Sequence, residues 1–98
     1  MNNDISDEKL EMAAEMLKAI AHPTRISILN KLKDGQKHNV TELYTMLCCG
    51  QATISHHLGI LKNKGILISK RDGKNTYYEI KKDVFVECVN NKIISQIL

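Results

Sequence analysis

The chain has 98 residues, of which 43% are hydrophobic, 26% charged and 4% aromatic, and its net charge is +3. This length is typical of one domain, so we expect residues 1–98 to form a single domain without separate catalytic and regulatory halves. The composition is that of a globular protein and excludes a collagen-like or disordered chain. No apolar run approaches the roughly 18–20 residues of a membrane span, so we expect no membrane partner.

The cysteine count and the first residues indicate a cellular compartment. Three cysteines are too few for a disulfide framework and are typical of a reducing cytosol. Residues 1–11 are acidic and polar, unlike a secretory signal peptide. We therefore expect a cytoplasmic protein, and its small size favours a binding module over an enzyme.

Charge is distributed unevenly along the chain. Residues 1–21 carry five acidic and two basic side chains, a net charge of −3, whereas residues 62–82 carry seven basic and two acidic side chains, a net charge of +5. The basic stretch indicates a face for an anionic polymer such as nucleic acid. A solvated basic surface without a partner gives the same pattern, so charge alone leaves both interpretations open.

Residues 6–21 predict an amphipathic helix with Ser6 as its N-cap. Its apolar side chains recur at helical spacing, at Leu10, Ala13, Ala14, Leu17, Ile20 and Ala21. Pro23 ends this helix and suits the first turn of the next one. The second helix carries an apolar stripe of Ile26, Ile28, Leu29 and Leu32, and Asp34-Gly35 ends it.

Two short helices follow with a tight turn between them. Asn39 and Glu42 form a capping-box pattern that begins a third helix, whose expected buried face is Leu43, Met46 and Leu47. Gly50 lies in the turn, and a fourth helix extends from Gln51 to Lys64, with Ile54, Leu58 and Leu61 facing inward. Two short helices joined by a turn that contains Gly predict a helix-turn-helix.

The remaining residues predict a β-hairpin and a last helix. Residues 66–71 and 76–80 are rich in β-branched and aromatic side chains, and they flank the turn Asp72-Gly73-Lys74-Asn75. Residues 83–98 predict a helix whose wide apolar arc favours contact with a partner. The fold class is therefore mainly α with a small β-hairpin: a winged helix-turn-helix with dimerisation helices at both termini.

Three segments give the chain its resemblance to a known family: residues 19–26, residues 51–58, and Lys64-Gly65-Ile66-Leu67 followed by residues 71–74 and Tyr77-Tyr78. Together they resemble the ArsR/SmtB family of bacterial repressors over nearly the whole chain. The resemblance implies a homodimer, joined through its first and last helices, that binds a palindromic operator in double-stranded DNA. It implies neither a catalytic residue nor a cofactor.

With the apolar residues of the fourth helix turned inward, its outer face is small and polar. Gln pairs bidentately with adenine, and Ser contacts bases or phosphates. Basic residues near the hairpin are expected to contact phosphates, with the hairpin tip in a flanking groove. The expected DNA-binding residues are Gln51, Ala52, Thr53, Ser55, His56, Lys62, Arg71, Lys74 and Asn75, and Lys64 is a further candidate for phosphate contact.

Three further polar residues are interpreted as structural. His57 precedes the inward-facing Leu58, which favours a half-buried histidine over a base reader. His22 and Arg25, at the start of the second helix, are interpreted in the same way, although Arg25 is also within reach of a phosphate.

The resemblance implies that a signal releases the DNA, through metal binding or thiol oxidation. The positions of one metal-binding type fall on Asn39 and Thr41, and residues 83–98, where another type has histidines, contain none. We therefore expect no metal site of either type. Cys48, Cys49 and Cys88 are either small core residues or redox-active thiols, and thiol oxidation is favoured over metal as the signal.

An alternative function is a winged helix that binds another protein without binding specific DNA. The small, polar outer face of the fourth helix and the basic hairpin favour DNA, because a protein-binding groove is more often lined by aromatic residues or Met.

Overall fold

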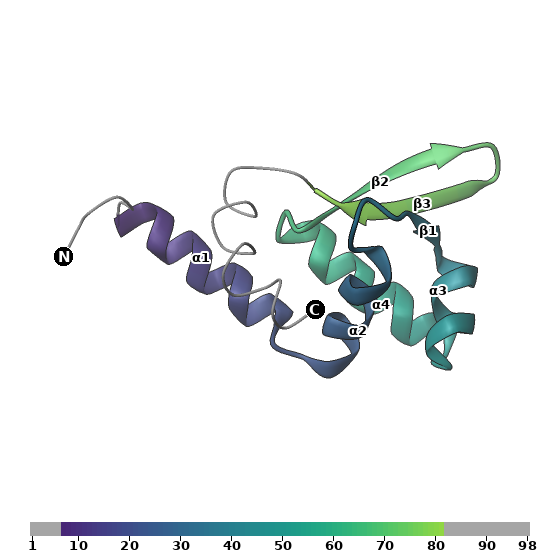
Figure 1. Cartoon of the computed structure of the whole chain (residues 1–98), viewed down its shortest axis with the longest axis horizontal. Coiled ribbons are helices and arrows are strands. Elements are labelled where there is room, and N and C mark those ends of the chain that lie inside the picture. The colour runs from purple at the N-terminus through teal and green to yellow at the C-terminus, as the bar shows by residue number, and fades with distance from the viewer. Residues whose placement is uncertain (1–6, 82–98) are drawn as a thin grey trace.

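The computed structural model describes residues 7–81. Its elements, in chain order, are α1 (Asp7–Ile20), α2 (Pro23–Leu32), β1 (His38–Asn39), α3 (Val40–Leu47), α4 (Gln51–Asn63), β2 (Leu67–Asp72) and β3 (Asn75–Ile80). Figure 1 shows α2, α3 and α4 beside the sheet, with α1 and the β2–β3 hairpin extending in opposite directions. The predicted fold class is confirmed in this part of the chain. The expected Ser6 cap and the helix at residues 83–98 lie outside the described residues.

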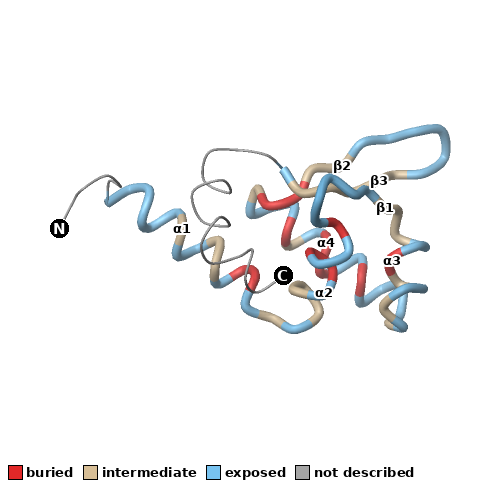
Figure 2. Tube along the Cα trace, in the orientation of Figure 1, coloured by how far each residue is buried: buried red, intermediate tan, exposed pale blue. Residues whose placement is uncertain are grey.

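The apolar stripe predicted for α1 is buried only at its C-terminal end. Ala19 and Ile20 are buried, whereas Leu10 is 51% exposed and Met12 is 53% exposed. Figure 2 shows the same gradient, from exposed at the start of the helix to buried at its end. Within residues 7–81 the stripe is therefore covered only near the C-terminal end of α1, because most of the helix projects beyond the helices against which its last turn packs.

The core lies where α2, α3, α4 and β2 meet. Its fully buried side chains are aliphatic: Ile28, Leu29, Leu32, Leu43, Ile54, Leu58, Leu61 and Leu67. Helix α2 begins at Pro23, as predicted, and the Nδ1 of His22 accepts a hydrogen bond from the Thr24 backbone N–H at 3.1 Å. The predicted turn after α2 is confirmed, since Asp34 and Gly35 both have left-handed backbone angles.

The capping box predicted for α3 is present, with Asn39 as the N-cap. Leu43 is fully buried and Leu47 is half-buried, but Met46 is 39% exposed. The prediction that Met46 is buried is wrong, because only one narrow face of this eight-residue helix contacts the rest of the fold. Leu43 and Leu47 are four residues apart on that face, and Met46 lies beside it.

The sheet has three strands in the order β1-β3-β2, and both pairings are antiparallel. Strands β2 and β3 approach the tip more closely than predicted, and Asp72 pairs with Asn75, so that only Gly73 and Lys74 connect them. Gly73 has a φ of 65°, which is common at the first central position of a tight hairpin. The sequence did not predict β1, because two residues, paired with Tyr77 and Tyr78, are too short to show a strand pattern.

Candidate nucleic-acid interface

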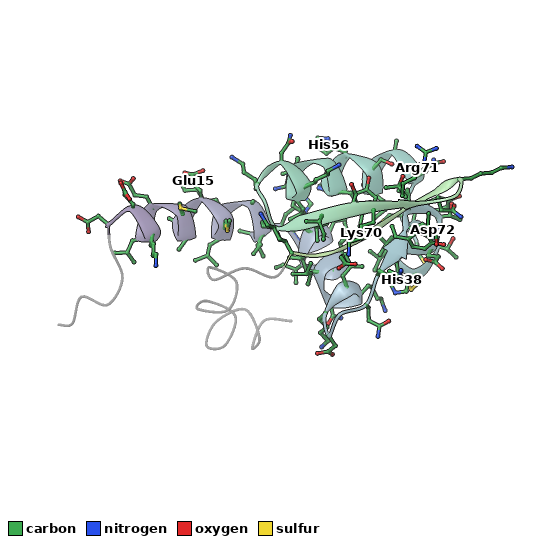
Figure 3. All side chains as sticks on the ribbon, turned by 90° about the horizontal axis from the view of Figure 1, so that it is seen from above. Glu15, His38, His56, Lys70, Arg71 and Asp72 are labelled. Carbon is green, nitrogen blue, oxygen red and sulfur yellow. The ribbon has the colours of Figure 1, made fainter. Side chains whose placement is uncertain are left out.

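Helix α4 separates apolar from polar side chains along its length. Ile54, Leu58 and Leu61 are completely buried against the core. The side chains predicted to read DNA are all exposed: Gln51, Ala52, Thr53, Ser55 and His56. In Figure 3, His56 points away from the body of the molecule. The predicted base-reading residues therefore share one accessible surface in the first half of the helix.

The N-terminus of α4 adds polar groups of the main chain to this surface. Gly50 is the N-cap, and no side chain caps this end. The first backbone N–H groups of a helix have no partner within the helix and suit an anionic oxygen. Cys48, in the turn before Gly50, has a φ of 55°, so the chain reverses sharply between α3 and α4.

The hairpin places a second polar group on the surface. Arg71, Lys74 and Asn75 are all exposed at or next to its tip, and the Nε of Arg71 donates a hydrogen bond to the Gly73 carbonyl oxygen at 3.3 Å. This contact directs the guanidinium along the turn. In the view of Figure 3, Arg71 of the hairpin and His56 of α4 both lie in the upper half of the molecule.

Two basic residues near the hairpin were not singled out from the sequence. The Lys37 ammonium lies 5.5 Å from the centre of the Tyr77 ring, and Lys70 Nζ lies 3.7 Å from Glu79 Oε2 across the hairpin. The exposed Lys37 adds positive charge at the base of the hairpin, whereas Glu79 offsets the charge of Lys70. The placement of Lys37 depends on β1, which had no sequence signal.

The two lysines at the end of α4 differ in their surroundings. Lys62 is exposed in the last turn, as expected of a phosphate contact. Lys64 Nζ instead lies 4.0 Å from Glu15 Oε1 of α1, and Glu15 also accepts a hydrogen bond from Lys18 at 3.4 Å. Lys64 therefore faces α1, away from the hairpin tip, and the structure does not favour it as a phosphate contact.

His57, His22 and Arg25 make the intramolecular contacts expected of structural residues, and His57 is buried where a half-buried side chain was expected. His57 is only 7% exposed, and its Nδ1 accepts a hydrogen bond from Arg25 Nε at 3.1 Å. Arg25 Nη1 also donates to the Ala19 carbonyl oxygen at 2.9 Å. Burial lowers the pKa of His57, and the charges of His22, Arg25 and His56 lower this pKa further. The sequence did not reveal the Arg25–His57 bond, because the two residues are far apart in the chain.

The two cysteines within the described residues have different environments. Cys48 is exposed, whereas Cys49 is half-buried, packs against the core and donates from Sγ to the Leu47 carbonyl oxygen at 3.5 Å. Cys88 lies outside the described residues. Between residues 7 and 81, no group of three or more His, Cys, Asp or Glu side chains is placed to hold a metal ion.

These features define the class of the protein. Helices α3 and α4, joined by a short turn, form a helix-turn-helix, and the β2–β3 hairpin beside them forms the wing. This is a winged helix-turn-helix, with an exposed polar face on its second helix and basic residues in the wing.

Comparison with known sequences gives the family. Residues 22–69 match the model of the arsR family of bacterial regulatory proteins. An HTH-type transcriptional regulator of Methanocaldococcus jannaschii is 40% identical over 84% of this chain and 92% of its own length. The transcriptional repressor PagR of Bacillus anthracis is 38% identical over 82% of this chain and 80% of its own. The chain belongs to the ArsR family and is a transcriptional regulator, not an enzyme.

Solved structures agree with this assignment. The crystal structure of PagR superimposes with a TM-score of 0.78 at 33% identity, covering 95% of this chain and all of that one. A homodimeric winged helix-turn-helix DNA-binding domain from Mycobacterium bovis has a TM-score of 0.71 at 27% identity, covering 90% of this chain and 81% of that one. Among residues 7–81, no helix has the length and apolar character needed to cross a membrane.

Proposed function

We propose that the protein is a homodimeric, sequence-specific repressor that acts in the cytoplasm and binds a palindromic operator in double-stranded DNA. The observation that carries the proposal is the division of α4, whose inner face is fully buried and whose outer face exposes small and polar residues at its N-terminal half. This is the end of a recognition helix that enters the major groove. The repressor PagR, with a similar sequence and structure, supports the direction of regulation.

The exposed residues of α4 suit base recognition. Gln51 is in the first turn, where its amide is able to pair with the N6 and N7 of adenine. Ser55 and His56 follow one turn later and supply hydrogen bonds to base edges or phosphates. Ala52 adds little bulk, which allows the backbone to approach the groove, and the neighbouring Thr53 completes this surface.

The basic residues suit the DNA backbone. Arg71, Lys74 and Asn75 at the wing and Lys62 at the end of α4 are exposed, and all four follow the base-reading residues along the chain. We assign these four residues to phosphates and to a flanking groove. Such contacts supply affinity that depends on salt, and the bases supply specificity.

The dimer contact is proposed to involve α1 and the helix expected at residues 83–98. Leu10 and Met12 are more than half exposed on α1, and within residues 7–81 the buried residues of this helix are Ala19 and Ile20 in its last turn. A second protomer would cover this apolar surface and place two α4 helices about 34–36 Å apart, one turn of B-DNA. The homodimeric domain from Mycobacterium bovis, which has a similar fold, supports this arrangement.

A double variant tests this contact. Leu10→Lys with Met12→Lys should convert the dimer to a monomer in analytical ultracentrifugation, because it places two charges in an apolar interface. Asn30→Lys, at an exposed position of α2, is the matched control and should remain dimeric. A double variant with the dimer affinity of the wild type would remove α1 from the interface.

We further propose that thiol oxidation releases the operator. Cys48 exposes its thiol in the turn that leads into α4, so a change at this residue acts directly on the position of the recognition helix. Cys49 and Cys88 are the candidate second thiols. Formation of a disulfide would remove two electrons and two protons from a thiol pair and transfer them to the oxidant.

One selection experiment tests DNA binding and release together. Reduced protein and protein oxidised with diamide are each used to select duplexes from a random library, which are then sequenced. We expect one palindrome from the reduced protein and none from the oxidised protein. The same palindrome from both would retain the repressor and exclude the thiol signal. The absence of any enriched sequence would instead favour a winged helix that binds protein.

A further inference from the structure

Arg25 connects the end of α1 to the buried face of α4. From its position in α2, its Nη1 donates to the Ala19 carbonyl oxygen at 2.9 Å and its Nε donates to His57 Nδ1 at 3.1 Å. Ala19 is in the last turn of α1, and His57 is in the middle of α4. One guanidinium therefore fixes the position of both helices relative to α2.

This arrangement requires the neutral form of His57. A guanidinium has donors only, so the Nδ1 that receives its Nε–H must carry a lone pair and no proton. In an imidazolium both ring nitrogens are donors. A proton on Nδ1 would turn the 3.1 Å hydrogen bond into a contact between two N–H groups, each on a cation. Protonation of His57 is thus incompatible with the observed position of Arg25.

Within residues 7–81, the groups that shift the pKa of His57 do not compensate for a positive charge. Those that shift its pKa are His22 and Arg25, at the start of α2, and His56, on α4 itself, and all three lower it. No group of α1, α3 or the sheet is among them, and α1 contributes only the neutral Ala19 carbonyl. The His22 ring centre lies 4.5 Å from that of His57, and the His56 ring centre lies 5.3 Å away.

We propose that Arg25 and His57 are positioning residues for the recognition helix, that they act only while His57 is neutral, and that acidification therefore releases the operator. This inference rests on the proposed function, because it takes α4 as the element that reads DNA. A proton that binds the released arrangement better than the DNA-binding one shifts the equilibrium toward release.

The size of the effect follows from the ordinary histidine pKa. An ordinary histidine has a pKa of about 6.5. A histidine that titrates in this range in the released protein and stays neutral in the bound one weakens binding roughly tenfold per protomer when the pH falls to about 5.5. Two protomers give roughly a hundredfold. Histidines on the DNA-binding surface act in the opposite direction, because their protonation adds positive charge and strengthens attraction to DNA. A loss of affinity on acidification therefore distinguishes His57 from exposed histidines such as His56.

The test compares three proteins on one probe, a fluorescent duplex that the wild type selects from a random library at about pH 7.5. His57→Asn is the informative variant, since an Asn Oδ1 occupies the place of Nδ1 and accepts a hydrogen bond without titrating. His38→Asn is the matched control, because His38 is a partly buried histidine outside this cluster. Dissociation constants are measured by anisotropy at about pH 7.5 and about pH 5.5.

We expect wild type and His38→Asn to lose affinity at the lower pH by about tenfold to a hundredfold, and His57→Asn to stay within about twofold. Wild-type affinity that does not fall, or that falls equally in His57→Asn, would overturn the inference and leave the repressor in place. Failure of the wild type to select any duplex at neutral pH would instead overturn the proposed function.

A measurement on the wild type alone keeps the inference testable if His57→Asn does not fold. Nitrogen chemical shifts of the His57 ring report which nitrogen carries the proton. We expect the Nε2–H tautomer at neutral pH, both free and bound to the duplex, with a lower pKa in the bound protein. An Nδ1–H tautomer, or the same pKa in both forms, would overturn the proposal.

Discussion

Asn39 and Glu42 each accept a hydrogen bond from the other's backbone at the start of α3. The Glu42 N–H donates to Asn39 Oδ1 at 2.8 Å, and the Asn39 N–H donates to Glu42 Oε1 at 2.9 Å. His38 Nδ1 lies 3.3 Å from the same Glu42 oxygen. Because His38 and Asn39 also form β1, the first turn of the helix-turn-helix is fixed to the sheet.

Removal of this cap should destabilise the fold. Asn39→Ala is expected to lower the free energy of unfolding by about 1 kcal/mol, because the Glu42 N–H loses its acceptor. The measurement is urea denaturation at neutral pH. Asn30→Ala, in the interior of α2, is the control and should cause no loss, since Ala is the better helix former. Equal stabilities of Asn39→Ala and wild type would show that the capping box contributes nothing to stability.

The same capping box predicts that the stability of the fold depends on pH in the acid range. The backbone hydrogen bond from Asn39 is the main cause of the lowered pKa of Glu42, and His38 contributes to it. A carboxyl whose pKa is lowered by folding adds stability above its unfolded value, about 4.3, and this stability is lost as the pH falls through the lowered pKa. Glu42→Gln keeps an acceptor oxygen but does not titrate. Its melting temperature should therefore fall less than that of the wild type between about pH 5 and about pH 3.

Glu11→Gln is the control for this effect, because Glu11 is on α1 and outside the capping box. Its acid profile should follow that of the wild type. If Glu42→Gln followed the wild type as well, the carboxylate form of Glu42 would have no role in the cap.

The base-reading surface is tested by two truncations. Gln51→Ala with Ser55→Ala should abolish specific binding to the selected duplex while the melting temperature stays near that of the wild type, because both side chains are exposed. Ser27→Ala, at an exposed position of α2, is the matched control. Specific affinity of the double variant within about twofold of wild type would exclude this face of α4, since a good bidentate pair alone contributes about 1–3 kcal/mol of discrimination.

The wing should contribute affinity without specificity. Lys74→Ala is expected to weaken binding to all sequences alike and to lower the slope of log affinity against log salt by about one. Lys31→Ala, in α2, removes the same charge elsewhere and should leave the slope unchanged. A loss confined to one operator position would instead identify Lys74 as a base reader.

The turn before α4 stores backbone strain. Cys48 has a φ of 55° and a ψ of 39°, a left-handed conformation that glycine adopts without steric cost. Cys48→Gly should stabilise the protein by about 0.5–1 kcal/mol. This value is the steric penalty that the Cβ of Cys48 causes in the left-handed conformation, minus the entropy that glycine adds to the unfolded chain. Cys48→Ala keeps the Cβ and should give no such gain. Urea denaturation under reducing conditions separates the two variants, and equal effects would show that the turn is unstrained.

Most of the fold could be predicted from the sequence because its signals are local. Helical periodicity placed α2 and α4, the Asn39 and Glu42 pair placed the start of α3, and Gly73 placed the hairpin turn. The exceptions depend on tertiary packing. The exposure of Leu10 and of Met46 follows from how far the neighbouring elements extend over each helix, which periodicity does not encode.

The part of the candidate site that depends on local sequence was also predictable. An alternation of buried and exposed positions within one helix identifies its outer face, so the exposure of Gln51 and Ser55 follows from the burial of Ile54 and Leu58. Contacts between distant segments left no such signal. Arg25 and His57 are far apart in sequence, and the position of Lys37 near Tyr77 requires the pairing of β1 with β3.

The short pairing of β1 with β3 also determines which part of the hairpin extends without a third strand beside it. Strand β1 contacts β3 only at Tyr77 and Tyr78, so from Thr76 outward the hairpin has two strands and no support from β1. In the proposed complex, the length of this free part sets how far from the centre of the operator the protein contacts the DNA. Each residue added to both strands would lengthen it by about 3.3 Å, close to the rise of one base pair. The footprint of the protein on DNA should therefore be adjustable in steps of one base pair at each end, without any change in the bases that α4 reads.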